Sequence, residues 1–313
     1  MASHISGKFR TTSDYKLHIM FEPHSPLRRS VLYVPASNER AMTKSWSLGA
    51  DTIVFDLEDA VALTAKAVAR ELLVKQFDED HYQGIETVIR VNDVNTVDFE
   101  ADLSAVARSR PNGVLLPKVD SVDDLYAFAR SAANANLPKD IRLWAMVETP
   151  AGIADLDAIV KAGIGLSPRL DCLVVGTNDI AKDTGVFPGD QRAYLMPWLM
   201  GILLVAKRRG VTVLDGVWND FRNEAGFAIE AQQSMKMGFD GKTLIHPLQV
   251  EPANRIFSPS LEALEEARRV VAVFSDPGHA ATNVVNLDGR MVERLHYEQS
   301  LRLLSKHAHV SRE

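Results

Sequence analysis

Short runs of apolar, largely β-branched residues alternate along the chain with longer stretches in which apolar positions recur at helical spacing. Each apolar run is bounded by Gly, Pro, Asp or Asn, which is typical of strands that are buried on both faces of a parallel sheet. The predicted strands are 30–34, 52–56, 87–91, 113–117, 142–147, 172–175, 212–214 and 242–245. The predicted helices between them are 39–48, 66–76, 97–107, 122–134, 153–162, 191–207 and 224–237.

This order of elements repeats a strand and a helix about eight times and therefore predicts a (β/α)8 TIM barrel over residues 28–250. An open Rossmann-like sheet would need a glycine fingerprint after its first strand. The turn at 34–40 reads VPASNER and contains no glycine, so the barrel is favoured.

Two segments flank the predicted barrel. Residues 1–27 form a polar leader, to which we assign no function. Residues 251–313 form a C-terminal helical extension, with helices at 261–274 and 291–305 joined by a loop. Because the barrel is already complete before this extension, we expect the extension to act as a lid or as a subunit contact.

The composition is that of a globular protein. The chain has 313 residues, of which 46% are hydrophobic and 24% charged, and its net charge is −6. One cysteine, Cys172 in an apolar run, excludes a disulfide-stapled scaffold and predicts an inert buried thiol. An acidic balance without a Lys/Arg cluster argues against nucleic acid as a partner.

Neither a membrane nor an export signal is predicted. No stretch approaches the ~18 to 20 apolar residues of a membrane-spanning helix, and the longest candidate, 200–206, is followed by three cationic residues. The N-terminal residues carry charges but no apolar core of signal-peptide type. We therefore expect a cytoplasmic location.

Polar side chains follow nearly every predicted strand, at the barrel end where chemistry is usually found. Glu148 closes the run AMVETP and Asp179 closes VVGTND, so two neighbouring strands offer carboxylates to one space. Such a pair fits Mg²⁺, which keeps water and substrate oxygens in its other positions. The alternatives are a salt-bridged strand end for Glu148 and a helix N-cap for Asp179.

Further candidates come from four other strand ends. Arg90 could hold a carboxylate or stabilise an enolate oxygen, or it could form an ion pair with a barrel carboxylate. The run DLEDAV at 56–61 follows a strand directly, so its acids are expected at the active rim rather than on a solvated face. Lys118 is expected to be a protonated partner rather than a Schiff-base lysine, and His246 to make a core hydrogen bond.

The chain resembles the citrate lyase β-chain-like family, which includes malyl-CoA and citramalyl-CoA lyases. The resemblance runs from about residue 28 to about residue 304 and is carried by DLEDAV, IRVN, LLPKV, VETPAG, GTNDIAKD and KTLIHPLQV, in the family's order. It implies a TIM barrel whose C-terminal helices reach a neighbouring subunit in a homotrimer or hexamer. It also implies reversible Claisen-type cleavage of a 3-hydroxyacyl-CoA thioester to an acyl-CoA and a 2-oxo acid.

The resemblance also implies roles for the residues at the rim. Glu148 and Asp179 are similar to the family's Mg²⁺ ligands, and Arg90 to the group that binds the thioester enolate oxygen. Glu58 and Asp59 resemble acids that lie near the metal-bound water.

Outside the rim, the resemblance implies two further contacts. Arg40 and Lys44 are candidates for binding the phosphates of coenzyme A. Asp288, in LDGRMV, resembles an aspartate that acts as acid or base in a neighbour's site.

Several reactions remain open. The leading one is an Mg²⁺-dependent lyase acting on malyl-CoA or citramalyl-CoA. The alternatives are a malyl-CoA thioesterase, the β-chain of a citrate lyase that works on a carrier-bound thioester, and an aldolase acting on free 4-hydroxy-2-oxo acids. The segment 160–171 is expected to lengthen the loop before the sixth strand.

Overall fold

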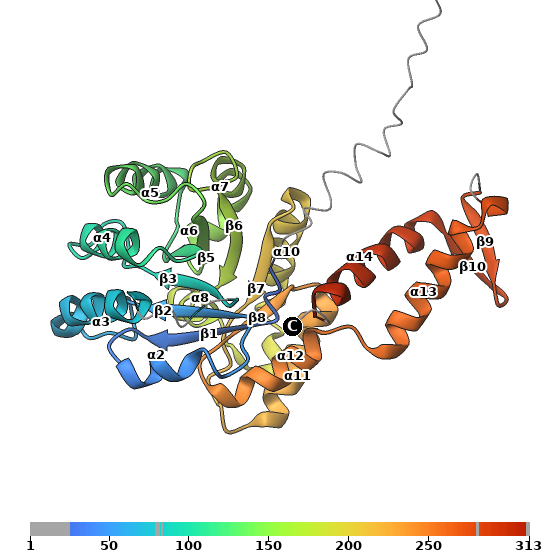
Figure 1. The fold of residues 1–313 in the computed structure, drawn as a ribbon, viewed down its shortest axis with the longest axis horizontal. Coiled ribbons are helices and arrows are strands. Elements are labelled where there is room, and N and C mark those ends of the chain that lie inside the picture. The colour runs from blue at the N-terminus through green and yellow to red at the C-terminus, as the bar shows by residue number, and fades with distance from the viewer. Residues whose placement is uncertain (1–25, 79–81, 83, 280–281, 311–313) are drawn as a thin grey trace, which may run out of the picture.

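A closed barrel of parallel strands forms the body of the molecule (Figure 1). The computed structural model describes residues 26–78, 82, 84–279 and 282–310. Each barrel strand pairs with its neighbours in the chain, and β1 closes the barrel against β8. The strands are β1 (Ser30–Pro35), β2 (Thr52–Asp56), β3 (Glu86–Arg90), β4 (Gly113–Leu116), β5 (Arg142–Val147), β6 (Leu170–Val175), β7 (Thr212–Asp215) and β8 (Gly241–Leu244). The (β/α)8 prediction is confirmed.

Helices surround the barrel. The longer ones are α2 (Glu39–Ser45), α3 (Lys66–Asp78), α4 (Phe99–Ser109), α5 (Val122–Asn134), α7 (Leu156–Gly163), α10 (Met196–Arg209), α11 (Glu224–Met237) and α12 (Val250–Phe257). Shorter elements lie in the loops: η1 (Leu63–Ala65), α6 (Pro150–Ala154), α8 (Thr177–Thr184), α9 (Gly189–Arg192) and η2 (Pro247–Gln249). The helices predicted at 153–162 and 191–207 are each divided in two, and α8 was not predicted. Among the described residues, no helix combines the length and apolar character needed to cross a bilayer.

The two faces of each strand have different surroundings. Val31, Val54, Val88 and Leu115 pack with one another inside the barrel, whereas their neighbours along each strand pack against the helices. Because successive strand residues point to opposite faces, the residue two positions after each inner one also faces inward. Cys172 belongs to this inner cluster, and burial raises the pKa of its thiol, in agreement with the predicted inert cysteine.

The C-terminal extension projects away from the barrel (Figure 1). It consists of α13 (Leu261–Ser275), η3 (Pro277–His279), β9 (Val284–Leu287), β10 (Arg290–Glu293) and α14 (Arg294–Val310). Val270, Phe274, Val285, Leu287 and Val292 form a small apolar core within it.

A β-hairpin in the extension corrects the predicted loop and helix boundary there. The expected loop between residues 274 and 291 contains β9, and the helix expected from residue 291 begins at Arg294. Asp288 and Gly289 join the two strands with φ values of 51° and 81°. Asp-Gly with two positive φ values is a favoured two-residue hairpin turn, and it explains why strands form here.

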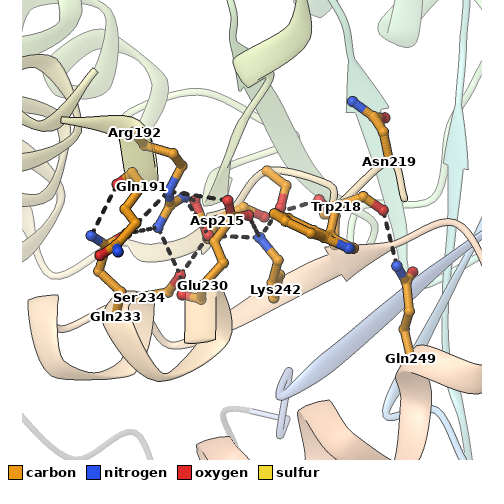
Figure 2. Close-up of polar contacts among 12 residues, drawn as sticks. Gln191, Arg192, Asp215, Trp218, Asn219, Glu230, Gln233, Ser234, Lys242 and Gln249 are labelled. Atoms are coloured by element: carbon orange, nitrogen blue, oxygen red, sulfur yellow. Dashed lines mark hydrogen bonds and ion pairs between the residues drawn. The ribbon is translucent and has the colours of Figure 1, made fainter. Parts of the chain in front are cut away.

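A buried ionic network joins β7 and β8 to the helix layer (Figure 2). Nζ of Lys242 lies 2.8 Å from Oδ2 of Asp215 and 2.8 Å from Oε1 of Glu230. Arg192 donates from Nη1 to both oxygens of Asp215, at 2.8 and 2.9 Å, and Ser234 donates to Oδ2. Burial alone would raise the pKa of Asp215, but Lys242 and Arg192 outweigh it and hold that pKa below its ordinary value. Two cations therefore compensate two carboxylates in the interior.

The network anchors an unusual stretch of backbone. Asp190, Gln191 and Arg192 have φ values of 51°, 54° and 63°, a left-handed conformation that is costly for residues other than glycine. The buried guanidinium of Arg192 fixes this stretch to Asp215, at the end of β7. The loop between α8 and α10 is thereby held against the barrel.

We expect Lys242→Met to lower the free energy of unfolding by about 3–5 kcal/mol, because it leaves a buried charge uncompensated. The matched control is Lys207→Met, which removes a lysine–aspartate pair of 2.7 Å whose lysine side chain is 46% exposed. An exposed pair of this kind contributes about 0–1 kcal/mol. Urea unfolding of both variants measures the difference, and equal losses would contradict the role assigned to the network.

Candidate functional site

A pocket of about 390 Å³ opens at the carboxyl ends of the barrel strands. Tyr33, Asp56 and Arg90 line it from β1, β2 and β3, and Asp179 and Asn219 line it from the loops after β6 and β7. Tyr33, Asp56 and Arg90 each lie two positions after an inner core residue, so the alternation of the strands directs them into the pocket. The structure thus brings together residues from distant parts of the chain at the end of the barrel where the sequence analysis expected them.

Glu148 lies directly after β5 and is buried, with 1% of its surface exposed. The backbone N–H of Lys118 donates to its Oε1 at 2.8 Å. A Cβ added to Gly176 would lie 2.4 Å from its Oε2, so glycine is required at this close approach. Burial raises the pKa of Glu148 to about 7; the Lys118 hydrogen bond opposes this shift, and the charges of Glu58 and Asp179 add to it.

Asp179 lies in the first turn of α8 and lines the same pocket. The N-cap of α8 is Gly176, so the alternative reading of Asp179 as the helix N-cap is wrong. Residues 164–169 connect α7 to β6, which begins at Leu170 and pairs with β5 up to Val175. The charge of Asp179 contributes to raising the pKa of Glu148.

Arg90 is held by two carboxylates. Its Nε and Nη2 donate to the two oxygens of Asp56 at 2.8 and 2.6 Å. Its Nη1 lies 2.9 Å from Oε2 of Glu58, without the alignment of a hydrogen bond. The guanidinium also lies over the ring of Tyr33, 5.0 Å from its centroid. Arg90 is therefore paired with a barrel carboxylate, as one interpretation of the sequence expected. It also lines the pocket, which the other interpretation, binding of a carboxylate or enolate oxygen, requires.

The loop after β2 carries the remaining acids. Asp56 accepts hydrogen bonds from the backbone N–H groups of Glu58 and Ala60, which folds the loop back over the strand end. Glu58 is buried and its Oε1 lies 2.7 Å from Nζ of Lys118. Burial raises the pKa of Glu58, while Arg90 and Lys118 oppose this shift. Asp59 is exposed and lines the pocket.

Lys118 is paired and does not have the low pKa that a Schiff-base lysine needs. Burial lowers its pKa, but the hydrogen bond and the charge of Glu58 outweigh burial and raise the pKa above its ordinary value. The expected role as a protonated partner therefore fits the structure better than nucleophilic chemistry does.

Tyr33 was not singled out from the sequence. Its hydroxyl oxygen is buried and has no hydrogen-bond partner among the described residues, although its ring lines the pocket. Buried polar groups are nearly always paired, so an unpaired hydroxyl at a pocket suggests a contact with a bound molecule. Its position two residues after Val31 was the signal that could have identified it.

Several predicted residues lie outside the pocket lining. Glu148 is buried against Gly176 and Glu58 against Arg90, both of which line the pocket, and Lys118 pairs with Glu58.

Arg40, Lys44 and Asp288 lie elsewhere. Arg40 and Lys44 are exposed on α2, next to the mouth of the barrel but not in the pocket. Asp288 lies in the hairpin turn of the extension, away from the barrel in Figure 1, and its carboxylate pairs with Arg269. The CoA-binding and acid/base roles of these residues remain predictions.

His246 caps a short helix instead of facing a ligand. Its Nδ1 accepts a hydrogen bond from the backbone N–H of Leu248 at 3.2 Å, and its ring stacks on Phe221 with centroids 4.3 Å apart. The hydrogen bond is structural, as expected, but it lies at an exposed helix cap and not in the core.

The donor set fits a hard divalent cation that keeps part of its own coordination shell. Among residues 26–78, 82, 84–279 and 282–310, no group of three or more His, Cys, Asp or Glu side chains could hold a metal ion. Glu148 and Asp179 offer two carboxylates, and the pKa of Glu148 is raised by burial first and then by the charges of Glu58 and Asp179. Mg²⁺ is commonly bound through one or two carboxylates together with water and substrate oxygens.

Comparison with known proteins identifies relatives over most of the chain. Residues 29–247 match the family model described as HpcH/HpaI aldolase/citrate lyase. A "(3S)-malyl-CoA thioesterase" of Cereibacter sphaeroides is 42% identical over 89% of this chain and 94% of its own length. The human mitochondrial "citramalyl-CoA lyase" is 31% identical over 85% of this chain and 81% of its own length.

A solved structure supports the same relationship. CitE from Mycobacterium tuberculosis, in complex with magnesium, acetoacetate and coenzyme A, is 26% identical and superposes with a TM-score of 0.70. The match covers 90% of this chain and 97% of that one.

We expect Glu148→Gln to stabilise the protein at pH 8 in the presence of a chelator, and not at pH 4. The folded protein holds the Glu148 proton up to a pKa of about 7, so its ionisation costs stability as the pH rises from the unfolded pKa to that value. At about 1.4 kcal/mol per pKa unit, the gain at pH 8 is about 3 kcal/mol.

Glu71→Gln is the control, because it removes an exposed carboxylate whose pKa is lowered by Arg108. It should bring no gain at pH 8. Thermal unfolding at the two pH values provides the measurement, and a gain for Glu148→Gln that does not depend on pH would disprove the assigned cause.

Proposed function

The chain belongs to the HpcH/HpaI aldolase/citrate lyase family, and on this basis we propose that it is a magnesium-dependent lyase of a malyl-CoA-type thioester. It cleaves a carbon–carbon bond of the 3-hydroxyacyl-CoA to give an acyl-CoA and a 2-oxo acid. The observation that carries this proposal is the buried carboxylate of Glu148, which lies against Gly176 directly next to the pocket that Asp179 and Arg90 line. Relatives named for malyl-CoA and citramalyl-CoA support the substrate class.

Glu148 and Asp179 are proposed to hold the magnesium ion. When bound, Mg²⁺ supplies Lewis-acid polarisation of the oxo-acid carbonyl oxygen. Glu148 is directed to this position by the backbone N–H of Lys118, and Asp179 by the first turn of α8.

Arg90 is proposed to bind the thioester oxygen. The 3-hydroxyl group loses its proton to a carboxylate of the pocket and becomes the carbonyl of the oxo acid. As the carbon–carbon bond breaks, its electron pair moves into the acyl thioester, and negative charge develops on that oxygen. A guanidinium fixed by Asp56 on two sides stabilises this charge without having to reorient. The carbon of the enolate must then receive a proton. We propose that Asp288 of a second copy supplies it, in a homotrimer or hexamer.

Arg40 and Lys44 are proposed to contact the phosphates of coenzyme A. Both are cationic, exposed and carried by α2, the helix that follows β1 at the mouth of the barrel. Phosphate groups bound there would leave the thioester end free to enter the pocket.

Hydrolysis of the thioester is the second candidate function. The 42% identical relative named a malyl-CoA thioesterase favours it. In this reaction, water attacks the thioester carbonyl carbon and free coenzyme A leaves as a thiol. The same groups would bind the metal and the thioester oxygen, so the products distinguish the two reactions.

Incubation of the protein with Mg²⁺ and malyl-CoA, citramalyl-CoA or citryl-CoA should release a 2-oxo acid without free thiol. Oxo acid is measured with a coupled dehydrogenase and thiol with a colorimetric reagent. Thiol without oxo acid would instead establish the thioesterase. No product from any of the three would overturn both and point to a carrier-bound thioester, as for a citrate lyase β-chain.

Asp179→Asn should weaken Mg²⁺ binding at least about tenfold, because it removes one of the two anionic ligands. Asp183→Asn is the matched control, since Asp183 is an exposed carboxylate on the same helix. Calorimetric titration with MgCl₂ compares the two variants with the unmodified protein. Equal affinities in all three would remove Asp179 from the metal site.

A further inference from the structure

Lys118 contacts two carboxylates of the site through two different groups. Its backbone N–H donates to Oε1 of Glu148 at 2.8 Å, and its ammonium donates to Oε1 of Glu58 at 2.7 Å. The two carboxylates come from different strands, since Glu58 follows β2 and Glu148 follows β5. Lys118 itself follows β4, so one residue connects three strand ends.

The backbone of Lys118 is left-handed, with φ of 51°. This conformation is costly for a residue with a side chain and free for glycine. A glycine here would keep the N–H directed at Glu148 and would remove the strain. A lysine at this position therefore indicates that its side chain has a role that offsets the cost.

Glu58 connects the ammonium group of Lys118 to the guanidinium of Arg90. Oε1 of Glu58 is held by Lys118, and Oε2 lies 2.9 Å from Nη1 of Arg90. Glu58 is buried, so it has little access to solvent that could replace either partner. Fixing one oxygen of this carboxylate fixes the other, and with it one side of the guanidinium.

We propose that Lys118 is a positioning residue that fixes the position of the Arg90 guanidinium relative to the Glu148 carboxylate. Its backbone holds the carboxylate proposed to bind the metal, and its side chain holds, through Glu58, the guanidinium proposed to bind the thioester oxygen. This inference rests on the proposed lyase function. Lys118 itself touches neither the metal nor the substrate in this role.

Two variants separate the side chain from the backbone. Lys118→Met removes the ammonium and keeps the strained backbone, whereas Lys118→Gly removes both the ammonium and the strain. Both retain the N–H that binds Glu148, so both should bind Mg²⁺ within about threefold of the unmodified protein. Loss of a group that orients a first contact typically costs about 10- to 100-fold, and we expect kcat to fall by this factor in both with little change in KM.

Stability and rescue complete the test. Lys118→Gly should melt at or above the temperature of Lys118→Met, because only glycine adopts the left-handed backbone freely. Lys118→Arg should recover part of the lost kcat, since a guanidinium can pair with Glu58. Lys207→Met, which removes an ion pair of the same 2.7 Å length outside the pocket, should keep full kcat.

The outcomes are distinct. Full kcat in Lys118→Met overturns the inference alone. So does a tenfold loss of Mg²⁺ affinity together with a lower melting temperature in both variants, because the residue would then support the fold or Glu148 only. If the unmodified protein neither binds Mg²⁺ nor cleaves the thioesters, the proposed function fails, and the inference fails with it.

Discussion

The mouth of the barrel holds more negative charge than its cations compensate, and the rest of the site is arranged around this excess. Glu148 is desolvated and faces the charges of Glu58 and Asp179, which leaves its pKa near neutrality. Asp215 is buried to a similar degree, yet Lys242 and Arg192 hold its pKa below the ordinary value. The compensated carboxylate belongs to a structural network, whereas Glu148 lies next to the pocket, against its lining residue Gly176. Perturbed carboxylates of this kind are typical of functional sites.

The alternation of side chains along a strand determines whether a strand-end residue faces the pocket or the helix layer. Asp56 ends β2 and Asp215 ends β7, so both are strand-end aspartates. Val54 faces the interior, and Asp56, two positions later, faces the pocket. Leu214 faces the interior, and Asp215, one position later, faces the helices. A shift of one residue along a strand therefore decides whether a strand-end aspartate lies at the pocket or in the buried ionic network.

This distinction limits what the sequence alone could predict. The alternation of strands and helices predicted the barrel, and the polar residues that follow the strands pointed to Glu148, Asp179 and Arg90. Both signals are local in the sequence. Asp215 also ends a short apolar run, yet it faces the helix layer, and such a run does not show which of its residues face inward. The two contacts of Lys118 depend on carboxylates that follow other strands, and no local sequence pattern shows such contacts.

The anchoring of Arg90 serves both candidate reactions equally, so the choice between them must be made elsewhere. A lyase needs a proton for the enolate carbon, whereas a thioesterase needs water at the thioester carbonyl. Within one chain, Asp288 lies on the projecting extension and its side chain is 69% exposed, away from the pocket. If it acts in the pocket of another copy, as proposed, the approach of that copy's extension would also exclude water from the mouth. Assembly through the extension would therefore favour carbon–carbon cleavage by delivering a proton donor and by restricting the entry of water.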